Sequence, residues 1–121
     1  PYHADCLEGL VSGPAIAKRA GKAANELSEN DEIWTLVADY IGQALVDYTL
    51  VLTPDIIVLG GGVMQQQHLL MKIRERFQKY LNNYLKLPCL DKYIVGPELL
   101  GDSGILGSLF LGQSALKKEQ E

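Results

Sequence analysis

The sequence has little cysteine, no long apolar run and no concentration of charge of one sign. Its two cysteines, Cys6 and Cys89, are too far apart in the chain to suggest a disulfide framework, so we expect a reducing, cytoplasmic environment. No apolar stretch approaches the roughly 20 residues that a membrane-spanning helix needs. The formal net charge is -4, without a long run of either sign. Neither a nucleic acid nor a membrane surface is therefore favoured as a partner.

An initiator methionine and a leader sequence are also missing. The chain opens on Pro1, Tyr2 and His3, whereas a secretory signal peptide opens on basic and then apolar residues. We therefore expect no signal peptide, and we expect a processed product or a piece of a longer protein. The 121 residues fit one domain with a core of modest size.

The most informative segment is residues 55–63, in which the apolar run of residues 56–59 leads into three consecutive glycines, Gly60, Gly61 and Gly62. Unbroken Ile, Val and Leu over so short a run are typical of a strand buried on both faces, with helices on either side. Ligands of open α/β sheets bind at the carboxyl ends of strands, and glycines let a flat or phosphorylated ligand reach the backbone. The segment therefore predicts a nucleotide-binding turn, with a tight, ligand-free connection as the alternative. The dinucleotide fingerprint fits poorly, because Gln65 stands where its third glycine belongs.

Helical periodicity precedes and follows this strand. We expect helices over residues 13–20, ending at Gly21, from about residue 31 to residue 52, from about residue 65 to the Leu87-Pro88 pair, and after residue 102. A second short strand is expected over residues 92–95. This order of elements predicts an α/β layer, but two strands make a thin sheet, so we expect further strands upstream of residue 1.

Two side chains near the start are of types that bind zinc. His3 and Cys6 lie three residues apart, but a closed structural zinc site needs four ligands. Cys89 and His68 lie far away on unrelated elements. From the residues alone we favour coincidence, and if the site exists, its other two ligands precede Pro1.

Glu8 and the glycine-rich segment 101–107 each allow two interpretations. Glu8 is either an exposed carboxylate that favours a helix N-terminus, which we prefer, or an acceptor for sugar hydroxyls. Residues 101–107 place Asp102 or Ser103 as a helix cap, and close helix packing is favoured over a helix N-terminus that faces a ligand. The other candidates receive structural interpretations: a buried thiol for Cys89, a solvated ring for His68, and core positions for Trp34 and Tyr48.

Taken together, residues 1–9, 12–16, 56–63 and 101–104 resemble the C-terminal portion of ROK-family sugar kinases, most of all the bacterial fructokinase branch. The resemblance extends from Pro1 to about Ala115. It implies the C-terminal lobe of an actin-like (ribonuclease H-like) ATPase fold, in an α/β enzyme that uses ATP and Mg²⁺ to phosphorylate a hexose, fructose above all. A homodimer is expected for the full-length protein, because family members are commonly dimers.

The resemblance also implies roles for particular residues. Gly60, Gly61 and Gly62 match the turn that holds the adenosine part of ATP or ADP. Glu8 matches the glutamate that hydrogen-bonds the sugar. His3 and Cys6 would be the last two ligands of a structural Zn²⁺, with a cysteine immediately before Pro1 and an earlier histidine as the others. Residues 1–121 would then form the nucleotide-binding lobe, and residues 1–8 the remnant of a zinc-binding segment.

The parts that do the chemistry in this family are absent from the chain. Its Asp-x-Gly phosphate loop and its catalytic aspartate belong to the N-terminal portion, and neither Asp55 nor Asp102 lies in a matching motif. We therefore assign no catalytic residue and expect the chain alone not to phosphorylate sugar. The alternative function is the sugar-sensing lobe of a ROK-type transcriptional repressor, whose DNA-binding segment would also lie upstream.

Overall fold

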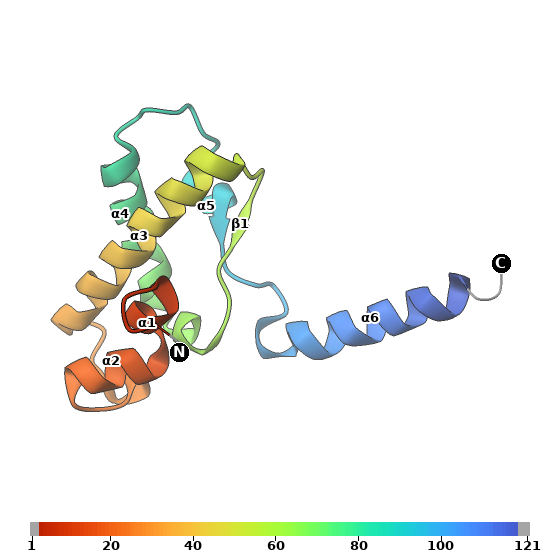
Figure 1. Cartoon of the computed structure of the whole chain (residues 1–121), viewed down its shortest axis with the longest axis horizontal. Coiled ribbons are helices and arrows are strands. Elements are labelled where there is room, and N and C mark those ends of the chain that lie inside the picture. Colours follow the sequence, from red (N-terminus) through yellow and green to blue (C-terminus); the bar gives the residue numbers. More distant parts are fainter. Residues whose placement is uncertain (1–2, 119–121) are drawn as a thin grey trace.

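Helices dominate the computed structural model, which describes residues 3–118 (Figure 1). In chain order the elements are α1 (Leu7–Val11), α2 (Gly13–Ala20), the 3-10 turn η1 (Ala24–Glu26), α3 (Glu32–Leu52), β1 (Ile57–Val58), η2 (Gly62–Gln65), α4 (Gln67–Leu81), α5 (Leu90–Tyr93), β2 (Ile94–Val95), η3 (Leu100–Asp102) and α6 (Ser103–Lys118). The two strands form a parallel sheet. A mostly helical α/β architecture with a small sheet is thus confirmed.

The core lies between α3 and α4. Asp31 caps α3 by accepting a hydrogen bond of 3.2 Å from the Ile33 N–H. The helix ends at Leu52, just before Thr53 and Pro54, as expected. One face of each helix is buried against the other, from residues at helical spacing: Trp34, Val37, Ile41, Leu45, Leu69, Ile73, Phe77 and Leu81. Gly42 lets the two backbones come close, because a Cβ there would lie 2.8 Å from Arg76 Cβ.

The sheet packs on these helices with one face only. Ile57 pairs with Ile94 and Val58 with Val95, and Ile94 is fully buried in the core. Val58, on the opposite face, is 57% exposed. The prediction of a strand buried on both faces is therefore wrong, because within residues 3–118 the covering helices lie on one side of the sheet.

The second long helix ends earlier than expected. Asn82 and Asn83 both adopt left-handed backbone conformations, with φ of 46° and 60°, which asparagine tolerates better than most residues. α4 therefore stops at Leu81 instead of continuing to residue 87. The short helix α5 then takes the first half of the expected strand, so β2 begins only at Ile94.

Two residues expected in the interior are on the surface. Cys89 is exposed in the turn before α5, so the prediction of a buried thiol is wrong. Trp34 is fully buried as expected, but Tyr48 is 47% exposed because it lies off the stripe of α3 that faces α4.

The last helix, α6, extends away from the body formed by the other elements (Figure 1). Large apolar side chains along it are exposed: Ile105, Leu106, Leu109, Phe110, Leu111 and Leu116. A Cβ on Gly104 or Gly107 would meet no atom within 4 Å, so the close packing favoured for this segment is not found within the described residues. None of the helices over residues 3–118 combines the length and the apolar character required to cross a bilayer.

Candidate functional site

The glycine turn presents bare backbone at the carboxyl end of β1. Gly60, Gly61 and Gly62 are all exposed, and Gly61 has φ of 94° and ψ of 174°, a combination that glycine adopts far more readily than other residues. The Met64 N–H donates to the Gly61 carbonyl at 3.1 Å, which closes the turn into η2. No side chain of the turn itself therefore shields its backbone from a ligand.

The second wall of the site comes from the end of β2. Because the strands are parallel and Val58 is level with Val95, Pro97 comes level with Gly60 two residues later. A Cβ on Gly60 would lie 3.9 Å from Pro97 Cγ. The parallel register thus brings a proline opposite the glycine turn, at the edge of the sheet where α/β proteins bind ligands.

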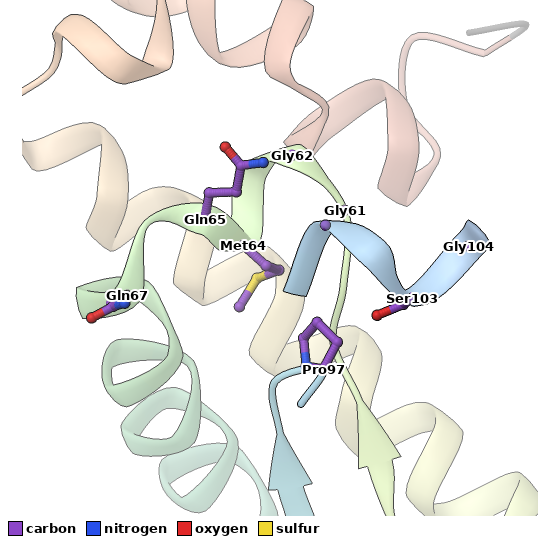
Figure 2. Close-up of a pocket in the computed structure, with 9 residues that line it drawn as sticks. Gly61, Gly62, Met64, Gln65, Gln67, Pro97, Ser103 and Gly104 are labelled. Atoms are coloured by element: carbon purple, nitrogen blue, oxygen red, sulfur yellow. The ribbon is translucent and has the colours of Figure 1, made fainter. Parts of the chain in front are cut away.

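η3 and the first turn of α6 supply a third wall (Figure 2). Together the walls surround a cavity of about 630 Å³, lined by Gly61, Gly62, Met64, Gln65, Gln67, Pro97, Gly101, Ser103 and Gly104. Figure 2 shows Met64 and Pro97 near the glycine turn and the start of α6, with the Gln65 side chain directed the other way. None of the lining residues is charged, and the volume is in the range of small-molecule sites, so the cavity suits a flat, uncharged part of a ligand.

The structure places the predicted turn residues unequally in this cavity. Gly61 and Gly62 line it, whereas Gly60 does not. Sequence reasoning missed Met64, Gln67 and Pro97 altogether. It also favoured a packing role for residues 101–107, three of which now lie in the wall. The signal that could have identified Pro97 is its position just beyond the carboxyl end of the second strand.

His68 lies just beyond the cavity, in the first turn of α4. Its Nε2 atom is buried and makes no hydrogen bond in the structure, and its ring is edge-on to Trp34 at a centroid distance of 5.2 Å. The prediction that His68 is solvated is therefore wrong. The apolar start of α3, which packs beside the first turn of α4, covers part of the ring.

The candidate zinc ligands lie at the beginning of α1, outside the cavity. Cys6 caps this helix, because its Sγ accepts a hydrogen bond of 3.4 Å from the Gly9 N–H, and it lies 3.6 Å from the His3 carbonyl. Between residues 3 and 118 no cluster of three or more His, Cys, Asp or Glu side chains is placed to hold a metal ion. The described residues thus do not by themselves provide the four ligands that a closed structural zinc site needs. Pro1, which would follow the third ligand, is outside the described residues.

Glu8 is exposed in the first turn of α1 and does not line the cavity. Its carboxylate is free to accept hydrogen bonds from hydroxyl groups of a ligand, and it also lies where an acidic side chain favours a helix N-terminus. The chain behind it is tightly packed, since a Cβ on Gly9 would lie 2.1 Å from the His3 carbonyl oxygen. Position 9 therefore requires glycine.

Known proteins resemble the chain over nearly its whole length. A sequence profile described as ROK family matches residues 1–115. A fructokinase from Pediococcus pentosaceus is 51% identical over 117 residues, which cover 97% of this chain and 41% of the relative. A putative fructokinase from Bacillus subtilis (strain 168) is 47% identical over 123 residues, covering 98% of this chain and 41% of the relative. A fructokinase from Lactococcus lactis subsp. cremoris is 41% identical over 121 residues, which cover 98% of this chain and 42% of the relative.

These matches have two consequences. The chain spans about two fifths of the length of these relatives, so the activity of a whole relative is not assigned to it by these matches. The family match, in contrast, extends from residue 1 to residue 115 of 121. The chain belongs to the ROK family.

Proposed function

We propose that residues 1–121 form the C-terminal, nucleotide-binding lobe of an ATP-dependent fructokinase with an actin-like (ribonuclease H-like) fold. The observation that carries this proposal is the exposed glycine turn at the end of β1, which faces a cavity of about 630 Å³. Relatives named fructokinase support the sugar-kinase class and favour it over the repressor alternative.

The nucleotide is proposed to lie with its adenosine part against Gly60, Gly61 and Gly62. An aromatic base needs a flat, apolar surface, and Met64, Pro97 and the glycine backbone provide one. The cavity wall carries no cation for the phosphates, so we assign phosphate binding to the upstream portion. Mg²⁺ would neutralise the phosphate charge in such an enzyme, and no residue of this chain is assigned to it.

Glu8 is proposed to accept hydrogen bonds from sugar hydroxyls, which its exposed carboxylate permits. Residues 1–8 are proposed to be the remnant of a structural zinc segment, in which His3 and Cys6 would hold Zn²⁺ with two ligands from upstream. Their nitrogen and sulfur donors are of the type that zinc prefers. We assign no catalytic residue here, and propose that the catalytic aspartate lies in the part of the protein that precedes this chain. A homodimer remains our proposal for the full-length protein.

Calorimetric titration with ADP tests nucleotide binding, with Gly61→Ala as the informative variant. Alanine at φ of 94° costs about 1–3 kcal/mol in backbone strain, and its methyl group intrudes on the backbone surface that the base would cover. We expect the Kd for ADP to rise about tenfold, which is about 1.4 kcal/mol.

Gly96→Ala is the matched control, because Gly96 lies in the neighbouring loop, has no positive φ and does not line the cavity. Its Kd for ADP should equal that of the wild type. The absence of binding at millimolar ADP would overturn the nucleotide-binding proposal. Phosphorylation of fructose by the 121-residue chain alone would contradict the assignment of catalysis to upstream residues.

A further inference from the structure

Arg74 on α4 makes a set of hydrogen bonds to the segment that carries β2. Its Nε and Nη2 donate to the Ile94 carbonyl at 2.9 and 2.7 Å. Its Nη1 donates to Asp91 Oδ1 at 2.8 Å, and Nη2 lies 3.4 Å from the Asp91 carbonyl. The Arg74 side chain is 21% exposed and that of Asp91 is 76% exposed. The bonds to Ile94 are therefore partly buried, whereas those to Asp91 are exposed.

The Ile94 carbonyl has few other possible partners. Successive carbonyls of a strand point to opposite edges: the Val95 carbonyl accepts from the Leu59 N–H at 2.8 Å within the sheet, so the Ile94 carbonyl points to the outer edge. Among residues 3–118 no further strand lies there. Arg74 supplies, from a helix, donors that a neighbouring strand would otherwise supply. Hydrogen bonds from a guanidinium are charge-assisted and stronger than neutral ones.

Both elements joined by Arg74 also form walls of the cavity. Gln67 lines the cavity and lies seven residues before Arg74 on α4, almost two helical turns, so the two side chains lie along one stripe of the helix. Pro97 lines the cavity and lies three residues after Ile94. Arg74 itself is not among the lining residues. Its bonds to Ile94 thus fix the strand that leads to Pro97 against the helix that begins at Gln67.

We propose that Arg74 is a positioning residue that sets the separation of Pro97 from the first turn of α4, and thereby the affinity for the nucleotide. This inference rests on the proposed function. Loss of the bonds to Ile94 frees the end of β2, and displacements of about 1 Å at a binding wall are enough to weaken productive binding severalfold or more. The sugar, assigned to other residues, should be affected far less.

Steady-state kinetics of the protein in its complete natural length, with ATP and fructose, test the proposal. For Arg74→Met we expect the KM for ATP to rise about tenfold, with the KM for fructose and kcat within about twofold of the wild type. Arg74→Lys keeps a cation but loses the planar fork that reaches Ile94 with two donors, so its KM for ATP should rise roughly threefold.

Two matched variants separate positioning from general stability. Asp91→Asn removes the exposed ion pair but leaves the Ile94 bonds, so the KM for ATP should stay within about twofold. Arg76→Met alters an arginine on the same helix, whose Nη1 lies 3.7 Å from Asp39 Oδ1 on the α3 side. This variant should leave the KM for ATP unchanged. The melting temperatures of all variants show whether a change in the KM for ATP is accompanied by a loss of stability.

The outcomes distinguish the two proposals. A lowered melting temperature for Arg74→Met with an unchanged KM for ATP would mean a merely structural role and overturn the inference. If Arg74→Met does not fold, Arg74→Lys decides: a KM for ATP equal to that of the wild type overturns the inference. If the wild-type protein neither binds nor uses ATP, the proposed function fails, and the inference fails with it.

Discussion

The side chains of Tyr80 on α4 and Asp39 on α3 are in contact, and this contact shifts the pKa of Tyr80. The Tyr80 hydroxyl donates a hydrogen bond of 2.6 Å to Asp39 Oδ1. This hydrogen bond, then the loss of hydration and then repulsion by the Asp39 charge, raise the pKa of Tyr80 above its usual value of 10.0. The folded state thus favours the neutral phenol, which can donate, over the phenolate, which cannot.

This raised pKa predicts a loss of stability in alkali. Between the unfolded-state pKa and the higher folded-state pKa of Tyr80, the folded protein binds more protons, so the free energy of unfolding falls as pH rises. The contribution is complete below pH 10.0 and is lost as pH rises through the folded-state pKa. We expect Tyr80→Phe to remove this part of the pH dependence, measured by urea unfolding at a series of alkaline pH values. An unchanged pH dependence in the variant would contradict the assignment.

Single residues were predictable from the sequence where their roles depend on the backbone. Three adjacent glycines indicate exposed backbone whatever packs elsewhere, and Gly60, Gly61 and Gly62 are exposed. The environment of His68 was not predictable, because the partly buried ring lies edge-on to Trp34, which is far away in the sequence. Cys89 was predicted to be buried because cysteine is among the residues most often found in protein interiors. It lies instead in an exposed connection before α5.

At the scale of elements, the α3–α4 pair depends on close approach at Gly42. A Cβ there would lie 2.8 Å from Arg76 Cβ and 3.0 Å from Phe77 N, and both atoms are fixed to the α4 backbone. Gly42→Ala gains about 1 kcal/mol in helix propensity but forces the helices apart, which costs about 1–3 kcal/mol. We expect net destabilisation, seen as a lower urea midpoint.

Gly107→Ala in α6 provides the comparison, because its Cβ would meet no atom within 4 Å. Helix propensity alone acts there, so the same substitution should leave the urea midpoint unchanged or raise it. A Gly42→Ala variant as stable as the wild type would mean that α3 and α4 separate without cost.

The elements with local start and stop signals were predicted well. Gly21 ends α2 in a left-handed conformation, and Asp31 begins α3, both as expected. The end of α4 was missed because an asparagine pair signals a stop only if its backbone turns left-handed. The cavity wall at Pro97 was missed for another reason: it depends on the parallel register of the strands, which no local pattern encodes.

At the scale of the whole molecule, α6 exposes a contiguous row of apolar side chains that includes Leu109 and Phe110. Patches of this kind drive association, so we expect the 121-residue chain to self-associate in sedimentation experiments. Replacing Leu109 and Phe110 together by glutamate should yield monomers. The control is Val51→Glu, which changes an exposed apolar residue at the end of α3 and should leave association unchanged. A monomeric wild-type chain would contradict the prediction.

The position of Trp34 gives the molecule an intrinsic optical probe. It is the only tryptophan of the chain, its indole N–H donates to the Ser28 carbonyl at 2.9 Å, and its ring lies edge-on to His68. Gln67, the neighbour of His68, belongs to the cavity wall. Emission from this single fluorophore therefore reports on the beginning of α4 without any attached label, and a shift in its wavelength marks a rearrangement between the core and that wall.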